Sequence, residues 1–502
     1  MTPPPQPRLP RPRAACAALA TLLLAACAAG PDFRQPAPPP VRGYVAHSPA
    51  GTVAAPGTTG GDAQHFRHGG DVAGDWWTLF DSPALDRLVE EALRHNPDLA
   101  AAQAALRAAH ENTLAQRGSF LPSVSAGVSA SREKDPSGAL APVPSNNAYL
   151  YNLFTPSVSV SYAPDVFGLN RRGHESLQAQ EQAVRFQAIA TYNTLTANVA
   201  VAAIQLAATQ AQLDATRKLV DINQHMLDIL RYRQSQGAAS LQDVAAQQAQ
   251  LAQVRAALPA LAKQQAQLRY QLAALVGRFP SEAPQQRFTL AGLKLPRELP
   301  LSLPSSLVAQ RPDVRQAQAN LHAASAQIGV AAASRLPQIQ LGADAGSTAL
   351  AIGKLFSAGT AFWNVAADVT APIFEGGTLM HQERAARAAY DEAAAQYRST
   401  VLAAFGDVAN TLTALQQDAK SLRDNATAAR AAQTSLDIAR RQVRDGYAAP
   451  SALLDAEQAW QQAQINLVQA QASRYADTVA LFQALGGGWW HRADTQRTSH
   501  EP

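Results

Sequence analysis

The chain has little of what most other classes of protein need. Its 502 residues include two cysteines, Cys16 and Cys27, and only 16% of its residues are charged. We expect Cys16 to be removed with the N-terminal segment, so the mature chain has too few cysteines for a disulfide framework or a cysteine metal site. No nucleophile, base and orienting residue stand at a recognisable motif spacing. We therefore predict that the protein is not an enzyme and uses no metal and no dissociable cofactor.

Nucleic acid is also excluded as a partner by the charge balance. The formal net charge is +4, and loss of three arginines in the N-terminal segment lowers it to +1. Binding to a phosphate backbone needs a dense patch of lysine and arginine, and this sequence has none. The basic isoelectric point therefore does not indicate a nucleic-acid partner.

Residues 1–26 resemble a bacterial lipoprotein signal peptide. They carry three arginines and no acid, followed by an apolar stretch from Ala14 to Ala26 that is too short to span a bilayer comfortably. The Leu-Ala-Ala-Cys stretch ending at Cys27 resembles a lipobox. This resemblance implies cleavage before Cys27, diacylglycerol on its sulfur and an acyl chain on its amine. Ala28 stands where an aspartate resembles an inner-membrane retention signal, so we expect an anchor in the outer membrane.

The remainder of the chain is a tandem duplication. Asn96-Pro97-Asp98 recurs as Arg311-Pro312-Asp313, and Gly237 recurs as Gly446. Residues 28–74 are rich in proline and glycine, which predicts a flexible tether. The proline-rich linker between the two repeats, residues 281–304, is expected to cross a surface. The predicted segments are a signal peptide at 1–26, an acylated tether and equatorial segment at 27–82, a first repeat at 83–280, a linker at 281–304, a second repeat at 305–488 and a tail at 489–502.

Each repeat contains a long helix with a seven-residue apolar period. Residues 174–236 contain no proline, which predicts one continuous helix. A strict heptad pattern is typical of supercoiled helices that pack along a narrow seam. The seam of the first helix recurs in the second: Val199, Leu206, Leu213, Val220 and Leu227 correspond to Val408, Leu415, Leu422, Ala429 and Leu436.

Each repeat also contains two stretches in which apolar and small polar residues alternate. They lie at 123–131, 157–162, 338–345 and 363–370. Such alternation is typical of strands in a membrane barrel, and soluble hairpins show it equally. The mature chain has no apolar run long enough for a transmembrane helix, so a spanning structure is expected to be a closed barrel. Four strands cannot close a barrel, whereas a trimer supplies twelve.

Five motifs, in the same order, resemble the outer-membrane factors of tripartite efflux pumps, which are OprM/NodT-like and more distantly TolC-like. The resemblance covers essentially the mature chain. The motifs are Cys27-Ala28-Ala29-Gly30-Pro31-Asp32-Phe33, Asp75-Trp76-Trp77 with Phe80, Arg311-Pro312-Asp313 with Ala326-Gln327-Ile328-Gly329-Val330, Pro372-Ile373-Phe374-Glu375-Gly376-Gly377, and Ala484-Leu485-Gly486-Gly487-Gly488-Trp489.

This resemblance implies a mixed α and β membrane protein that works as a homotrimer. Each protomer would give four strands to a twelve-stranded outer-membrane barrel and long coiled-coil helices to a periplasmic α-barrel. The trimer would be a passive exit duct for small molecules delivered by an inner-membrane pump of the resistance-nodulation-division type through a periplasmic adaptor, the membrane fusion protein. Two alternatives stay open: a TolC-like duct for type I protein secretion, and a lipid-anchored structural coiled-coil protein.

The resemblance also implies a periplasmic gate. Gly237 and Gly446 stand at the helix-reversing turns, where the family contacts its adaptor. Asp243 and Asp455 occupy positions that resemble a ring of acids around the closed aperture. Arg441 and Arg444 are candidate partners for these acids, since the family's latch residues are replaced here. The alternative is that both acids simply favour helix N-termini.

Overall fold

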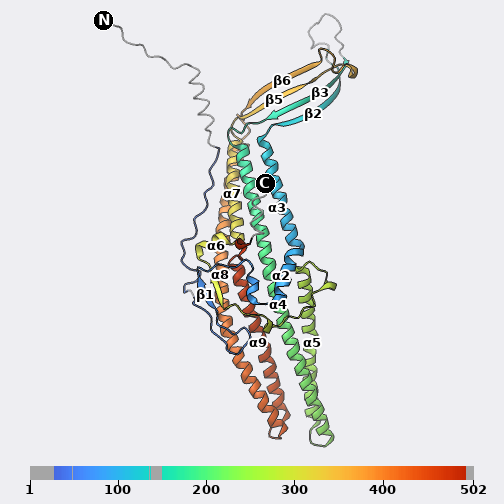
Figure 1. Cartoon of the computed structure of the whole chain (residues 1–502), viewed down its shortest axis with the longest axis vertical. Coiled ribbons are helices and arrows are strands. Elements are labelled where there is room, and N and C mark those ends of the chain that lie inside the picture. Colours follow the sequence, from blue (N-terminus) through green and yellow to red (C-terminus); the bar gives the residue numbers. More distant parts are fainter. Residues whose placement is uncertain (1–27, 48, 135, 137–149, 493–502) are drawn as a thin grey trace, which may run out of the picture. The chain divides into compact units, whose positions relative to one another are not determined.

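The computed structural model describes residues 28–47, 49–134, 136 and 150–492, and the elements follow the same order twice (Figure 1). α4 and α8 have 67 residues each, and α5 and α9 have 35 each. The predicted tandem duplication is thereby confirmed. The first copy is α2 (Pro83–His95), α3 (Pro97–Arg117), β2 (Ser123–Lys134), β3 (Leu150–Tyr162), α4 (Leu169–Ser235) and α5 (Leu241–Leu275). The second copy is α6 (Pro304–Gln310), α7 (Pro312–Ala333), β5 (Gln338–Ser347), β6 (Ala361–Thr370), α8 (Thr378–Arg444) and α9 (Pro450–Ala484).

The chain divides into two compact units, and the long helices α4 and α8 contribute to both. The first unit consists of Met1–Gln35, Arg107–Ala183 and Gln318–Gln396, and it holds the four long strands. The second unit consists of Pro36–Leu106, Val184–Ala317 and Tyr397–Pro502, and it holds the hairpins α4–α5 and α8–α9.

The four strands of the first unit form one antiparallel sheet in the order β2-β3-β5-β6 (Figure 1). Residues directly opposite each other share a face, so the register decides what each face carries. One face carries apolar residues across all four strands: Ala126 lies opposite Val158, Val158 opposite Ala345, and Ala345 opposite Trp363. The other face is polar, with Ser159 opposite Asp344 and Asp344 opposite Asn364. The predicted period-two alternation is confirmed.

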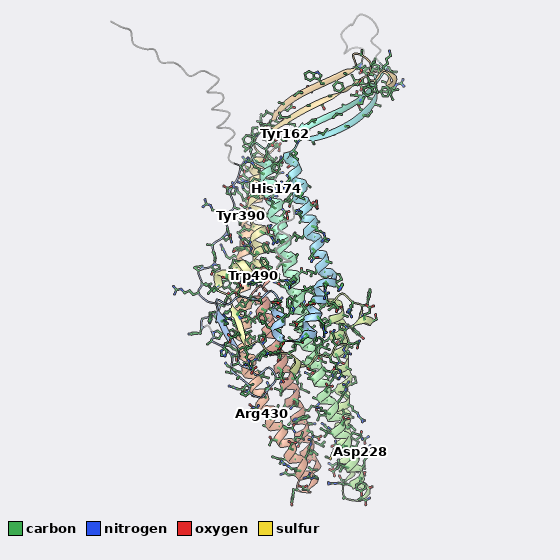
Figure 2. All side chains as sticks on the ribbon, viewed as in Figure 1. Tyr162, His174, Asp228, Tyr390, Arg430 and Trp490 are labelled. Atoms are coloured by element: carbon green, nitrogen blue, oxygen red, sulfur yellow. The ribbon has the colours of Figure 1, made fainter. Side chains whose placement is uncertain are left out.

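The predicted heptad seam forms the core of the two hairpins. Its positions in α4 and α8 are buried, except for Val220, which is half-buried. Near the turns, Leu227 and Leu230 pack with Val244 of α5, and Leu436 packs with Leu453 of α9. Met226 of α4 packs against both clusters and so links the two hairpins. Asp228 and Arg430, labelled in Figure 2, lie on the exposed faces of α4 and α8.

Aromatic residues of the second unit build a separate core around the motif at 75–80. Trp76, Trp77 and Phe80 lie in the short helix η1 (Trp76–Phe80) and are buried. The Trp76 ring stacks on Phe482 of α9 with 5.3 Å between ring centroids. The tryptophan motif is therefore a packing element that joins the segment before α2 to the end of α9.

The structure refines two expectations about the connecting segments. The linker at 281–304 does not simply cross a surface, because Leu290, Leu293, Leu295 and Leu299 are buried and β4 (Glu298–Leu301) pairs in parallel with β1 (His65–His68). The segment 28–74 is not a free tether throughout, since β1 lies within it and Gln64 is fully buried. Composition predicted solvated chain in both cases, but partners distant in sequence bury these residues.

No helix in the described ranges is both long enough and apolar enough to cross a membrane.

Candidate functional site

The turns of the two hairpins have the same backbone geometry. Gly237 and Gly446 adopt left-handed φ angles of +75° and +82°, which favour glycine. The amide of Ala238 donates to the carbonyl of Arg233 at 2.8 Å, and that of Tyr447 donates to Gln442 at 2.8 Å. These are the six-residue hydrogen bonds of a Schellman C-cap. Both glycines therefore stop a long helix in the same way and reverse the chain.

The return helices begin differently after these turns. Ser240 caps α5, and Asp243 completes a capping box: the Ser240 amide donates to Asp243 Oδ2 at 3.1 Å, and the Asp243 amide donates to Ser240 Oγ at 3.1 Å. The side-chain and backbone hydrogen bonds from Ser240 hold the pKa of Asp243 below its usual value. Asp243 thus has a helix-capping role whatever else it does.

Asp455 has no such role. α9 begins at Pro450 after Ala449, which offers no side-chain cap, and no acid stands in its first turn. Asp455 lies further along the helix on an exposed face that it shares with Gln458 and Gln462. The explanation by a helix N-terminus therefore fits Asp243 and does not fit Asp455.

The structure does not pair the predicted acids with the predicted arginines within one chain. Arg444 Nε lies 2.9 Å from Asp445 Oδ1, and this contact raises the pKa of Arg444. In the part of the chain that is described, no ion pair joins Asp243 or Asp455 to Arg441 or Arg444. Their grouping into a gate stays a prediction.

A buried polar layer lies further from the turns, and the sequence analysis did not identify it. The Gln247 side chain of α5 donates to the carbonyl oxygen and to the side-chain oxygen of Asn223 of α4, at 3.1 and 3.0 Å. At the edge of this layer, Gln458 on the exposed face of α9 donates to the buried Gln250 of α5 at 3.1 Å, so side chains also connect the two hairpins. In the sequence, Asn223 is a polar residue at a position of the apolar seam, and this exception to the pattern could have predicted a buried polar contact.

Glu457 of α9 belongs to this layer and is almost fully buried, with 1% exposure. Burial raises the pKa of its carboxyl group to about 7, although the charge of Arg440 in α8 and the nearby side chain of Asn223 lower it. A carboxyl group without a strong counter-charge in a low-dielectric setting favours its neutral form. The layer therefore contains one group that titrates near neutral pH.

The motifs at the starts of the two repeats donate hydrogen bonds to equivalent carbonyl groups, those at the ends of the return helices α5 and α9. Asn96 donates through Nδ2 to the carbonyl of Leu275 at the end of α5, at 3.0 Å. Arg311 donates through Nη1 to the carbonyl of Ala484 at the end of α9, at 3.1 Å. Leu275 and Ala484 are each the last residue of a 35-residue helix. These motifs therefore cap the return helices and have a structural role.

Cys27, the predicted lipidation site, lies outside the described residues, which begin at Ala28. Within the described ranges, no three metal-ligating side chains of His, Cys, Asp or Glu gather into a site. The expectations that Cys27 carries lipid and that the protein needs no metal both stay predictions.

Comparison with known proteins identifies the family. The family model "Outer membrane efflux protein" matches residues 88–278 and 303–487, one match in each repeat. The chain is similar to the pyoverdine export outer membrane protein OpmQ of Pseudomonas putida, with 30% identity over 82% of this chain and 88% of that protein.

Two further comparisons cover almost the whole chain. The antibiotic efflux pump outer membrane protein ArpC of Pseudomonas putida is 30% identical over 95% of each chain. The solved structure of the outer-membrane channel OprN has a TM-score of 0.80 and 26% identity, and the match covers 92% of this chain and all of that chain. These matches confirm the predicted fold class and the outer membrane as the location. The chain belongs to the outer membrane efflux protein family.

Proposed function

We propose that this protein is the outer-membrane channel of a tripartite efflux pump and works as a homotrimer. The observation that carries this proposal is the four-stranded sheet. Its outer strands β2 and β6 have 12 and 10 residues, and neither has a second strand partner in the described residues. Its apolar face is open to solvent in one chain, with Val128 80% exposed and Trp363 78% exposed.

Closure of this sheet into a barrel with copies of itself would pair the free edges of β2 and β6 and would let lipid cover the exposed apolar face. Unpaired backbone groups are expensive in a bilayer, so a membrane-embedded sheet must close into a barrel. The smallest membrane barrels have about eight strands, so one chain is not enough and three copies supply about twelve. The apolar face would then contact lipid, and the face with Ser159, Asp344 and Asn364 would line the pore.

The hairpins would form the periplasmic part of the duct. Long helices with a heptad seam pack side by side, and each protomer contributes two equivalent hairpins. The turns at Gly237 and Gly446 would contact the periplasmic adaptor. We place the gate near these turns and favour Asp455 over Asp243 as the acid that faces the aperture, with Arg441 and Arg444 as candidate partners from neighbouring protomers.

The cargo would be small organic molecules. OpmQ is named for pyoverdine export and ArpC for antibiotic efflux, which supports this class of substrate. The duct would be passive, with the energy supplied by an inner-membrane pump of the resistance-nodulation-division type. Acylation of Cys27 would anchor each protomer in the inner leaflet of the outer membrane.

Imaging and conductance test the channel. The purified protein is imaged by negative-stain electron microscopy and reconstituted into planar bilayers. We expect threefold particles with a hollow stalk, and stepwise conductance in the bilayer. Monomers without conductance would overturn the proposal in favour of a structural coiled-coil lipoprotein.

Complementation tests the cargo. The gene is expressed in a host that has lost its own channel but keeps an efflux pump with adaptor and a type I secretion system. We expect restored drug resistance without restored protein secretion. Restored secretion without resistance would identify a secretion duct.

A further inference from the structure

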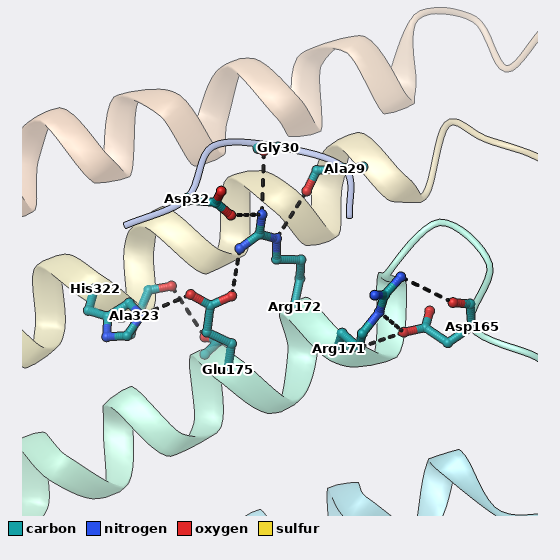
Figure 3. Close-up of polar contacts among 10 residues, drawn as sticks. Ala29, Gly30, Asp32, Asp165, Arg171, Arg172, Glu175, His322 and Ala323 are labelled. Atoms are coloured by element: carbon teal, nitrogen blue, oxygen red, sulfur yellow. Dashed lines mark hydrogen bonds and ion pairs between the residues drawn. The ribbon is translucent and has the colours of Figure 1, made fainter. Parts of the chain in front are cut away.

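The first described residues, 28–33, are packed against the body of the first unit instead of extending into solvent (Figure 3). The Ala29 amide donates to the carbonyl of Phe167 at 3.0 Å. The Phe33 ring stacks on His322 of α7, with 4.3 Å between ring centroids and 14° between ring planes. The segment contains residues 29–33 of the motif that starts at Cys27. The function proposed above does not explain why these residues pack against the first unit.

Arg172, in the first turn of α4, holds this segment. Its side chain is only 7% exposed, and its guanidinium contacts Asp32 Oδ1 at 2.7 Å and Glu175 Oε2 at 2.7 Å. Its Nε donates to the Ala29 carbonyl at 3.1 Å, and its Nη2 donates to the Gly30 carbonyl at 3.5 Å. Burial opposes the charge of Arg172, but the hydrogen bonds and charges of Asp32 and Glu175 raise its pKa overall. A buried guanidinium needs such partners, and three of its four contacts are made to residues 29–32.

Glu175 connects this cluster to α7. Its second oxygen, Oε1, lies 2.9 Å from His322 Nε2, and His322 is the residue on which Phe33 stacks. One carboxylate therefore orients both side chains that contact the segment, as Figure 3 shows.

Close backbone packing adds a steric requirement. Gly30 has φ +88°, and a Cβ at this residue would lie 2.5 Å from Gly329 Cα of α7. A Cβ at Gly329 would lie 2.7 Å from Arg172 Cγ and 2.9 Å from the Ala29 carbonyl oxygen. Both glycines belong to motifs that the sequence analysis identified, at 27–33 and 326–330. Their shared function in this structure is to let the segment and α7 approach closely.

We propose that Arg172, Glu175, His322 and Gly329 form a docking site for residues 28–33, which holds the acylated N-terminus at the start of α4. The proposal rests on the lipidation of Cys27 proposed above. Ala28 is joined directly to Cys27, and α4 begins shortly after the last residue of β3, Tyr162. A seated segment thus keeps the acyl group beside the foot of the strands, where the membrane boundary of a barrel would lie. Arg172 is the positioning residue in this arrangement.

Limited proteolysis of the full-length, acylated protein in detergent tests the docking. We expect tryptic cleavage after the exposed Arg34 to be slow while residues 28–33 occupy their site, and the exposed Arg42 provides an internal reference. Arg172→Met keeps the apolar stem and removes the charge. We expect cleavage after Arg34, relative to Arg42, to accelerate by about tenfold or more, since a hydrogen bond to a charged group contributes about that factor.

Arg171→Met is the matched control. Arg171 is the neighbouring residue, half-exposed and paired with Asp165 at 3.4 Å, and among the described residues no hydrogen bond or ion pair joins it to the segment 28–33. We expect its cleavage ratio to equal that of the wild type. Equal ratios in Arg171→Met and Arg172→Met would overturn the proposal.

A further variant and a further measurement complete the test. Asp32→Ala changes the segment itself, at a side chain that is 91% exposed, and therefore leaves the fold of the body intact. It should accelerate cleavage less than Arg172→Met does, because the contacts of Arg172 with the carbonyls of Ala29 and Gly30 remain, and a larger acceleration than in Arg172→Met would contradict the docking. Mass spectrometry of the wild type separates this proposal from the lipidation. If mass spectrometry finds no acyl group on the wild type but Arg34 is protected, lipidation fails and docking stands; rapid cleavage of an acylated wild type overturns docking alone.

Discussion

The hairpins α4–α5 and α8–α9 share their geometry and differ in their chemistry. Their helices have the same lengths, their turns have the same glycine cap, and the same leucine positions are buried. The first hairpin has a serine–aspartate capping box, whereas the second has none. The two copies therefore agree in helix length and turn geometry and differ in the residues that cap the return helices.

The buried polar layer shows the same divergence. The α4–α5 hairpin pairs two neutral amides, Asn223 and Gln247, which satisfy each other. The second hairpin places the ionisable Glu457 near Arg440. Neutral pairs are insensitive to pH, so the comparison predicts that pH acts on the second hairpin.

The largest expected effect tests the shared part of the comparison. Leu227→Ala and Leu436→Ala each empty an equivalent buried position, at 2% and 0% exposure. We expect each to lower the free energy of unfolding by about 3 kcal/mol, through lost burial and the cavity left behind. Thermal unfolding of the purified protein measures both. If the decrease in the free energy of unfolding in one variant is less than half of that in the other, the two hairpins are not equivalent in stability.

The second effect tests the divergent layer. A carboxyl group whose pKa rises from 4.5 to about 7 on folding binds more protons in the folded state. Stability is then greatest at low pH and falls as pH rises from about 4.5 through 7, by an amount on the order of 3 kcal/mol. Glu457→Gln should remove this part of the pH dependence and stabilise the protein at pH 8.

Asp418 of α8 contributes a second pH dependence to the stability, which does not involve Glu457. Burial, and then Asp477, raise the pKa of Asp418 to about 7, so some pH dependence must persist in Glu457→Gln. The measurement is therefore the difference between the unfolding curves of variant and wild type at pH 5 and at pH 8. The same difference at both pH values would contradict the assignment to Glu457.

A smaller effect tests the helix starts. Ser240→Ala removes the cap of α5 and should cost about 1 kcal/mol. Ala449 precedes α9 with an extended backbone suited to a cap, so Ala449→Ser should stabilise the protein by a similar or smaller amount. Thermal unfolding measures the two variants together. Opposite signs are expected, and a stabilising Ser240→Ala would contradict the capping role of Ser240.

The smallest effect on stability concerns the proposed gate. Asp455→Asn changes an exposed residue that caps nothing, so the unfolding temperature should be unchanged while single-channel conductance or its cation preference changes. Asp243→Asn is the matched comparison, and it should alter stability slightly with little effect on conductance. The reverse result would make Asp243 the acid at the aperture.

Much of the fold could be predicted because its determinants are local or periodic. The heptad seam from Val199 to Leu227 identified α4 and, by duplication, α8. Alternation in four stretches identified the strands, and the glycines at 237 and 446 identified the turns. Each of these patterns follows from the repeat distance of one helix or strand, which neighbouring residues specify without reference to the rest of the chain.

The site was less predictable because its contacts join residues far apart in the sequence. Asp32 meets Arg172 across 140 residues, and Gln458 meets Gln250 across 208. Proline and glycine content described residues 28–74 as a tether, since composition does not register a distant guanidinium. Asp243 and Asp455 looked alike as acids after a turn, and only the hydrogen bonds of Ser240 separate them.

The duplication, the helices, the two-faced strands and the family motifs could be read from the order of the amino acids alone, because periodicity and spacing carry that information. The folded chain was needed to show that the N-terminal segment is seated on Arg172, that leucines of the linker are buried and that Glu457 lies beside the polar layer. Burial and electrostatic environment depend on which surfaces meet in space, and that is a property of the folded chain.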